Sequence, residues 1–391
     1  MIDDNPFSIE GQWFRGNTHS HTTASDGSLT VTELAGWYEE YGYDFLFVTD
    51  HDLVADLSDR GQTTILLIPG AEIVMCWDEV YVAEMLSLGI DEVKRAAVHP
   101  QQIIDDVLEL GGLPFVSHPH LSGVSSGSLM KLEGIAGIEV FNGGAVGSGG
   151  RHLATIHWDD LLSNGRMVWG LASDDRHSGL GSPEEAGDRA KGWVMVKAEE
   201  CTRESIIDAM RNGLFYSTSG PVIHDIKISD AEVTVHCSAA RAVTFVSLPW
   251  MGRRVSAEPG DLITEASLPL DRLATPAKVA ETSEQWLEKG YFTKPKEMPT
   301  FFRVEIEDET AQLALESLTS SGTVYTLPVA VGHPSSEPYI YVSTDGLERI
   351  GQQANRSLER YERERPLRFS MPREDLRSQL GLSQREFGTV L

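Results

Sequence analysis

The feature that most constrains the fold is a set of short, continuously apolar runs that alternate with amphipathic stretches between residue 12 and about residue 222. A strand with one solvated face alternates apolar and polar residues, whereas a continuously apolar run suits a parallel strand that is buried on both faces. The runs are residues 45–51, 65–72, 113–120, 137–143, 167–177 and 192–198. Together with the stretches between them, they predict an α/β fold with a parallel sheet.

The amphipathic stretches carry helix signals. Residues 29–42 contain Thr30 and Glu33 at the spacing of a capping box, and they end at a glycine. Similar start and stop signals occur in residues 100–112, 155–165 and 203–213. This β/α alternation leaves open whether the sheet closes into a barrel or stays open and doubly wound.

The pattern changes after Pro221. Residues 223–239, 242–249 and 300–308 alternate with period two, which predicts a small antiparallel β-domain. The end of the chain is rich in Arg and Glu, with a helical pattern around residues 347–364. We therefore expect a metallohydrolase barrel over residues 1–222, a β-sandwich-like accessory domain over 223–330 and a C-terminal extension with a helical tail over 331–391.

Charge and composition limit the partners. A formal net charge of −27 argues against nucleic acid, because neutralising phosphates requires clustered Lys and Arg. The absence of a run of eighteen apolar residues argues against a membrane span. The acidic N-terminus and three scattered cysteines favour a cytoplasmic location. We expect a small-molecule substrate, and the sequence leaves a homo-oligomer open.

Histidines and acids gather where the apolar runs end. In β/α proteins the active site forms at the C-terminal ends of the strands, so these side chains should lie close together. Six of the twelve histidines fall there, and hydrophobic packing gives no reason to collect such costly groups beside strand ends. The residues are His19, His21, Asp26, Asp50, His51, Glu72, His118, His120, Asp174, Asp175 and His177.

This mixture of imidazole and carboxylate donors, without thiolate, suits Zn, Mn or Fe and disfavours Ca. More than four candidate ligands predict at least two ions, and a paired centre is typical of hydrolysis by a metal-bridging hydroxide. No G-x-S-x-G motif is present to indicate a serine nucleophile instead. The sequence therefore predicts a hydrolase with two or three divalent metal ions.

Taken in order, the motifs resemble those of the PHP (polymerase and histidinol phosphatase) superfamily. The resemblance covers about residues 13–310, and residues 158–166 and 215–221 resemble its carbaryl-hydrolase-like branch. It implies a distorted (β/α)7 barrel and a metal-dependent phosphoesterase or related hydrolase. The matching motifs are His19-x-His21, SDG with Asp26, TDH with His51, PGAE with Glu72, SHPH with His118, and SDDRH with Asp175 and His177.

The resemblance also implies a ligand set. One ion would be held by His19, His21, Glu72 and Asp175, a second by Asp26, His51 and His177, and a third by Glu72 and His118. The residues expected to carry catalysis are His19, His21, Glu72, Asp175 and His177. Many relatives have a further histidine where this chain has Glu84. Glu84 is therefore either a substitute ligand or an exposed residue of a strand or hairpin.

Six other residues are candidates for supporting the ligands or contacting substrate. Asp50 and Asp174 are expected to orient neighbouring histidines or backbone, and His120 to support the ligands or face the substrate. Arg176 would pair with a phosphate or form a surface salt bridge, and Tyr216 would cover the pocket or pack against the barrel. Asn142 lies at a motif position at the end of the fourth run, directly after the residues GIEVF.

Three functions remain open. The favoured one is a phosphoesterase acting on a small organic phosphate. The alternative is a carbamate or carboxylic-ester hydrolase with the same metal centre, because the same activated water attacks phosphorus or an acyl carbon. A non-catalytic PHP binding module ranks third, because the ligand set is intact.

Overall fold

A computed structural model describes residues 5–77, 83–147, 151–177, 191–289 and 298–308, and the backbone of residues 324–328 and 339–343. The chain divides into two compact units, Met1–Glu307 and Asp308–Leu391. In the second unit, strand β16 (Val324–Pro328) pairs with β17 (Tyr339–Ser343) in antiparallel fashion. The predicted helical tail around 347–364 lies outside the described residues. The predicted domain boundaries stay predictions.

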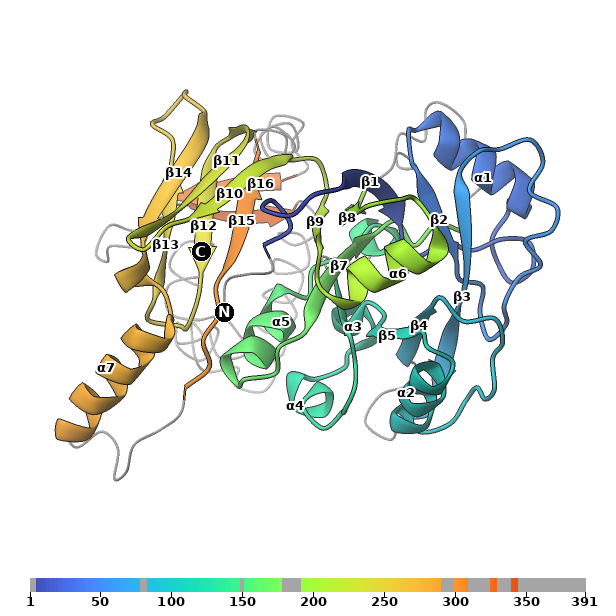
Figure 1. The fold of residues 1–391 in the computed structure, drawn as a ribbon, viewed down its shortest axis with the longest axis horizontal. Helices are drawn as coiled ribbons and strands as arrows, with labels where there is room; N and C mark the ends of the chain where they lie inside the picture. Colours follow the sequence, from blue (N-terminus) through green and yellow to red (C-terminus); the bar gives the residue numbers. More distant parts are fainter. Residues whose placement is uncertain are drawn as a thin grey trace, which may run out of the picture. The chain divides into compact units, whose positions relative to one another are not determined.

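The first unit is built around a nine-stranded sheet that curls into a nearly closed barrel (Figure 1). The strands lie in the order β7-β6-β5-β4-β3-β2-β1-β8-β9. Ser217 on β9 joins the two edges, since its Oγ donates to the Gly170 carbonyl on β7 at 2.6 Å and accepts from the Ala172 amide at 3.1 Å. The bounds are β1 (Gln12–Asn17), β2 (Phe45–Val48), β3 (Leu66–Met75), β4 (Ala83–Leu88), β5 (Leu113–Val116), β6 (Gly137–Asn142), β7 (Trp169–Ser173), β8 (Trp193–Ala198) and β9 (Phe215–Thr218).

The barrel-like α/β architecture agrees with the prediction, but the sheet is mixed and has nine strands. Strands β1, β2 and β3 are parallel, as are β5, β6 and β7. Strand β4 is antiparallel to both neighbours. Its direction relative to β3 follows from the connection from Met75 to Ala83, which is too short for the crossover that a parallel pair needs. The prediction of a parallel strand at 192–198 was wrong, since β8 runs antiparallel to β1 and β9 and buries alternate residues.

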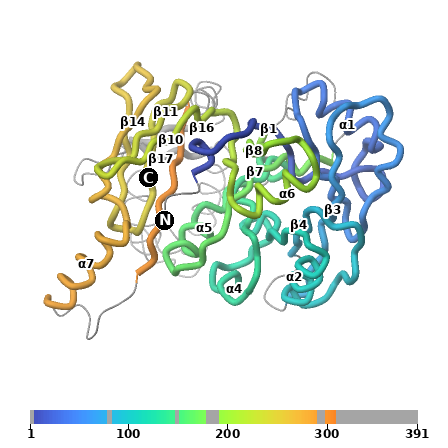
Figure 2. The backbone as a smooth tube through the Cα atoms, viewed as in Figure 1, coloured from blue at the N-terminus to red at the C-terminus, as the bar shows by residue number. Residues whose placement is uncertain are grey.

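The four predicted helices are all present, and Figure 2 shows how the chain follows them around the sheet. Helix α1 (Val31–Glu40) has the predicted capping box: the Glu33 amide donates to Thr30 Oγ1 at 3.3 Å, and the Thr30 amide donates to Glu33 Oε2 at 2.9 Å. Each helix buries apolar side chains against the sheet, which fixes the loops at the strand ends. The other three helices are α2 (Pro100–Glu109), α5 (Thr155–Ser163) and α6 (Arg203–Arg211), with short helices α3 (Pro119–Ser122) and α4 (Ser126–Leu129) between them.

The β-rich region contains two antiparallel sheets, as its period-two pattern predicts. The first consists of β10 (Ile223–Ile228), β11 (Glu232–Ala240) and β14 (Ile263–Pro269), and the second of β13 (Gly252–Ser256), β12 (Ala242–Val246) and β15 (Arg303–Glu307). Val235 of the first sheet and Phe245 of the second share one apolar core. Helix α7 (Pro276–Glu288), which the pattern did not predict, begins at a Thr275 cap. Among the described residues no helix is long and apolar enough to cross a membrane.

The Ser217 contact predicts a measurable contribution to stability. Replacing Ser217 with Ala leaves the Gly170 carbonyl and the Ala172 amide without their partner at the closure of the barrel. We expect the free energy of unfolding to fall by about 1–3 kcal/mol, measured by urea denaturation. The control is Ser256→Ala at an exposed strand end, and an equal effect of the two substitutions would contradict the role of this contact.

Candidate metal centre

The side chains predicted to meet at the strand ends do lie together. His19 and His21 follow β1, and His51, His118 and Asp175 follow β2, β5 and β7. Isolated bridges between Ser20 and Arg176, and between His51 and Glu72, extend the pairing of the strands beyond their regular ends. Strand pairing thus brings residues far apart in the sequence to one rim of the barrel.

Four donor atoms form a compact buried group, called the first position here. His19 Nε2 lies 3.1 Å from both His21 Nε2 and Glu72 Oε2. Asp175 Oδ1 lies 3.3 Å from both imidazole nitrogens, and His21 Nε2 lies 3.4 Å from Glu72 Oε2. Ligands with bonds of ~2.0–2.2 Å at tetrahedral angles are separated by ~3.3–3.6 Å. Asp175 Oδ1 is buried and has no hydrogen-bond partner among the described residues, so the group fits a divalent ion.

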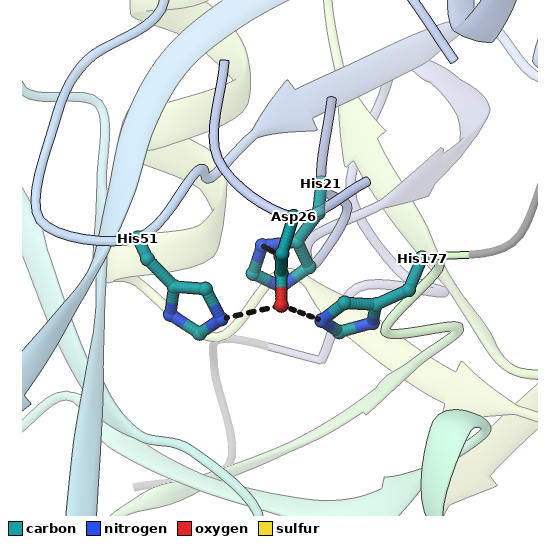
Figure 3. Close-up of side chains that lie close together, drawn as sticks. All are labelled: His21, Asp26, His51 and His177. Carbon is teal, nitrogen blue, oxygen red and sulfur yellow. Dashed lines mark ion pairs between the residues drawn. The ribbon is translucent and has the colours of Figure 1, made fainter. Parts of the chain in front are cut away.

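A second group, called the second position, surrounds Asp26 (Figure 3). Asp26 Oδ2 lies 3.4 Å from His177 Nε2 and 3.5 Å from His51 Nε2, and Oδ1 lies 3.6 Å from His21 Nδ1. The Asp26 side chain is 55% exposed and that of His177 is 39% exposed, whereas His21 is buried. The second position therefore opens to solvent, in contrast to the first.

A third group, called the third position, contains His51, Glu72 and Glu84, with His118 beside the two carboxylates. His118 Nε2 lies 3.2 Å from Glu72 Oε1 and 3.5 Å from Glu84 Oε2. Burial, together with repulsion from Glu72, raises the pKa of Glu84 to about 7. The alternative of an exposed strand residue was wrong for Glu84, whose side chain is only 13% exposed and faces the cluster.

Glu139 is an important residue that the sequence analysis missed. It lies on β6, fully buried, and its Oε1 accepts from His19 Nδ1 at 2.9 Å. Its Oε2 accepts from the His118 amide at 2.9 Å. Because a carboxylate only accepts, Nδ1 of His19 carries the proton and Nε2 offers its lone pair to the first position. A charged residue within an otherwise apolar strand was the signal that could have identified it.

Three predicted supporting residues hold the ligands in place. Asn142 Nδ2 donates to Glu139 Oε2 at 3.0 Å and to Asp175 Oδ2 at 3.1 Å, so it links two buried carboxylates. Asp50 accepts from the backbone amides of residues 22 and 25, which fixes the loop that carries Asp26. Asp174 accepts from the amides of residues 191 and 192 and from the hydroxyl of residue 38. Both aspartates orient backbone, as expected, rather than imidazoles.

The other three predicted supporting residues, Arg176, Tyr216 and His120, make contacts outside the cluster of candidate ligands. Arg176 is buried rather than at the surface, with its guanidinium 3.8 Å from the Trp37 ring centre, and its pairing with a phosphate stays a prediction. Tyr216 packs edge-on against Trp13 at 5.3 Å between ring centres, which matches the packing alternative. His120 Nδ1 donates to the backbone carbonyl of residue 153 at 2.7 Å. Contact of His120 with substrate stays a prediction.

Two candidate ligand residues have backbone conformations that residues other than glycine rarely adopt. His118 has a φ of 22° and Asp175 a φ of 48°. Left-handed backbone costs energy for residues other than glycine, and it persists where the surrounding structure imposes it. Here both residues leave parallel strands and turn their side chains back into the cluster.

Electrostatics couple the buried groups to one another. Burial lowers the pKa of His21, but the nearby carboxylates of Asp175 and Glu72 outweigh it and raise that pKa to about 9. Burial is likewise outweighed at His118, mainly by the Glu72 carboxylate 3.2 Å from its Nε2, and the pKa rises to about 9. Burial raises the pKa of Asp175 and Glu72, yet the charge of His19 holds both below their usual values. The cluster therefore holds protons where an ion would bind.

Comparisons with known proteins give limited matches. No family model matches the chain. A stretch of 79 residues is 38% identical to the 5'-3' exoribonuclease Rnm of Escherichia coli (strain K12), and equally to that of Salmonella typhimurium. The stretch covers 19% of this chain and 27% of either exoribonuclease, so the chain matches only about a quarter of the length of these relatives.

Three solved structures show weaker likeness. A two-domain protein from Bacteroides vulgatus, containing a predicted PHP-like metal-dependent phosphoesterase, has a TM-score of 0.44 and 15% identity over 66% of this chain and 86% of its own. An amidohydrolase from Chromobacterium violaceum has a TM-score of 0.37 and 15% identity, and the match covers 51% of this chain and 97% of the amidohydrolase. The lesion-specific endonuclease EndoQ from Pyrococcus furiosus has a TM-score of 0.35 and 12% identity, and the match covers 97% of this chain and 90% of the endonuclease. TM-scores this low do not establish a shared fold.

Substitution of Glu139 tests its role in positioning. In Glu139→Gln the carboxylate that orients His19 becomes a neutral amide, whose NH2 group faces the donating His118 amide. We expect metal affinity to fall by about 10–100-fold, measured by competition with a chromogenic chelator. Glu305→Gln on the exposed side of β15 is the control, and unchanged affinity in Glu139→Gln would contradict the assignment.

The raised histidine pKa values predict that metal binding releases protons. Below about pH 9, His21 and His118 are protonated in the metal-free protein, so an ion must displace those protons. Affinity for Zn²⁺ should therefore increase with pH up to about 9. Calorimetry at neutral pH in buffers with different ionisation enthalpies measures the release. A binding enthalpy that is independent of the buffer would contradict the prediction.

Proposed function

We propose that this protein is a PHP-type, metal-dependent phosphoesterase that acts on a small organic phosphate. The observation that carries the proposal is the first position, where the donor atoms of His19, His21 and Glu72 lie 3.1–3.4 Å apart. Asp175 Oδ1 lies 3.3 Å from both imidazole nitrogens. The ordered motifs of the sequence support it, because every metal ligand that the resemblance implies contributes to the same cluster. A structural metal site needs only four ligands, whereas this rim gathers more.

The buried and the exposed candidate ligands would hold different ions. His19, His21, Glu72 and Asp175 would hold an ion in the buried first position, and Asp26, His51 and His177 one in the second. Divalent ions bound there supply activation of the attacking water and neutralise charge on the phosphoryl oxygens. Because the second position opens to solvent, substrate would approach on the side of Asp26 and His177.

The buried acids and Asn142 supply the rigidity that this chemistry needs. Glu139 holds the His19 ring and the His118 backbone, and Asn142 holds Asp175. The ligand atoms are thus fixed before substrate arrives, and little reorganisation is required when charge develops on the phosphoryl group.

A second candidate is cleavage of the phosphodiester bond at the 5' end of a nucleic acid. The 79-residue match to 5'-3' exoribonucleases favours it. The net charge of −27 opposes it, because the phosphate backbone would be repelled unless the binding surface were locally basic. We therefore rank a small phosphate first. The alternative, a carbamate or carboxylic-ester hydrolase, uses the same metal centre. Only a test of different substrates distinguishes it from a phosphoesterase.

A substrate panel tests the proposal. Protein loaded with Mn²⁺ or Zn²⁺ is offered phosphomonoesters, short 5'-phosphorylated oligonucleotides, carbamates and aryl esters, and we expect turnover of the phosphomonoesters. Asp175→Asn should lower that turnover at least ~100-fold, because it removes a charged donor of the first position. Circular dichroism checks folding, and Asp230→Asn in an exposed turn is the control.

Each other outcome selects a different function. Turnover of carbamates or esters alone would contradict the phosphoesterase. Turnover of oligonucleotides alone would favour the second candidate. Metal binding without hydrolysis of any substrate would point to the non-catalytic module.

A further inference from the structure

Strand β1 changes its pairing partner at the rim of the barrel. Its pairing with β8 ends at Gly16. From Ser20 onward the chain pairs instead with the segment that follows β7, through the bridge between Ser20 and Arg176. The His21 amide also donates to the Arg176 carbonyl at 2.9 Å. Asn17 lies between these two regions of pairing, so its side chain is placed where the ends of β1, β7 and β8 meet.

The Asn17 side chain joins the two segments that carry most of the first position. Its Oδ1 accepts from the Asp174 amide at 2.9 Å, and its Nδ2 donates to the His19 carbonyl at 2.7 Å. The same nitrogen donates to the Tyr38 hydroxyl at 2.9 Å. That hydroxyl donates in turn to Asp174 Oδ2 at 3.1 Å. A closed ring of hydrogen bonds therefore runs from Asn17 through Tyr38 to Asp174 and back.

The partners of Asn17 require a side-chain amide at this place. An amide offers two N–H donors and an acceptor oxygen, and all three are used here. Exchange of its nitrogen and oxygen would set NH2 against the donating Asp174 amide and oxygen against the His19 carbonyl, so the orientation is fixed. Asn17 and Tyr38 are fully buried, where a donor or acceptor without its partner is costly.

Asp174 completes the junction from the side of β7. Its Oδ1 accepts from two backbone amides that lead into β8. The next residue, Asp175, has left-handed backbone and places its Oδ1 3.3 Å from His19 Nε2. Asn17 therefore holds the backbone of His19 and the backbone immediately before the turn at Asp175 through one side chain.

Asn17 and Glu139 act on different parts of His19. Glu139 fixes the ring, because its Oε1 accepts from His19 Nδ1. Asn17 fixes the backbone, and so it determines where the ring is attached relative to Asp175. Because its donors and its acceptor are already used, Asn17 positions ligand residues and does not itself bind an ion.

We propose that Asn17 is a positioning residue that sets the coordination geometry of the first position, by holding His19 and Asp175 at their separation. It fixes geometry and supplies neither charge nor a donor atom to the ion. The ordered motifs assign no role to Asn17 or Tyr38. This inference rests on the proposed function for the metal centre that Asn17 would position.

Absorption spectroscopy with cobalt tests the inference without reference to hydrolysis. The full-length metal-free protein is titrated with Co²⁺, whose visible absorption bands change in wavelength and intensity with the number and arrangement of its ligands. The titration measures affinity, and the spectrum at saturation reports coordination geometry. A substitution that only lowers the stability of the fold leaves the spectrum of the saturated, folded protein unchanged.

Two substitutions at Asn17 keep its shape and remove different hydrogen bonds. Asn17→Asp keeps the acceptor for the Asp174 amide but loses the NH2 group, and Asn17→Leu loses all three bonds. We expect both to shift the visible bands at saturation. Affinity for Co²⁺ should fall about 10–100-fold in Asn17→Leu, and by less in Asn17→Asp.

Ser217→Ala is the matched control. It also removes two hydrogen bonds within the barrel, but its partners are the backbone groups of Gly170 and Ala172 on β7 rather than those of candidate ligands. Thermal unfolding should show a lower midpoint in Ser217→Ala as in the Asn17 variants. The cobalt spectrum and affinity of Ser217→Ala should match those of the wild-type protein.

The outcomes distinguish this inference from the proposed function. Wild-type spectra and affinity in the Asn17 variants would overturn the inference and leave the proposed function intact. An equal spectral change in Ser217→Ala would also overturn it, because general loosening of the barrel would then explain the effect. If Asn17→Leu does not fold, the result for Asn17→Asp decides. Wild-type protein that binds no Co²⁺ would remove the metal centre on which both depend.

Discussion

The buried contact between Glu139 and His19 is the interaction on which the rest of the site depends. A carboxylate inside the barrel is costly, and Glu139 is tolerated because it accepts from an imidazole, a backbone amide and the Asn142 side chain. Those same bonds fix the His19 ring and the turn at His118. Glu139 on β6 thereby connects the ends of β1 and β5, and it also accepts from the Ser173 hydroxyl on β7. It therefore fixes the positions of several candidate ligand atoms. Loss of this contact would loosen several ligands at once.

The reversed strand places the acidic side chain of Glu84 at the rim of the barrel without an additional loop. In a regular βα repeat, only strand C-termini reach the catalytic rim, and side chains arrive there from the following loops. Strand β4 runs the other way, so its N-terminal end meets the rim and Glu84 is held by ladder hydrogen bonds on both sides. A ligand on a strand is positioned more rigidly than one on a loop. This difference matters because Glu84 is where the chain departs from the motif set that it resembles.

Much of the site could be predicted because its signals are local. His19, Glu72 and Asp175 each end or follow an apolar run, and Thr30 and Glu33 define a helix start within four residues. Other features depend on long-range pairing that no local pattern encodes. The direction of β8, the burial of Arg176 under Trp37 and the closure by Ser217 all arise from residues distant in the sequence. Glu139 had a local signal, a charge within an apolar strand, but its meaning depends on a histidine 120 positions away.

The gradient of burial across the cluster has a kinetic consequence. Donors of the first position are almost wholly enclosed, whereas Asp26 and His177 in the second are 55% and 39% exposed. An ion held in the enclosed position would leave only when the barrel rim opens, so its exchange would be tied to local unfolding. An ion held in the open position would exchange at the rate of ligand dissociation alone. The inner ion would then stay with the folded chain, whereas occupancy of the outer position would depend on the concentration of free metal.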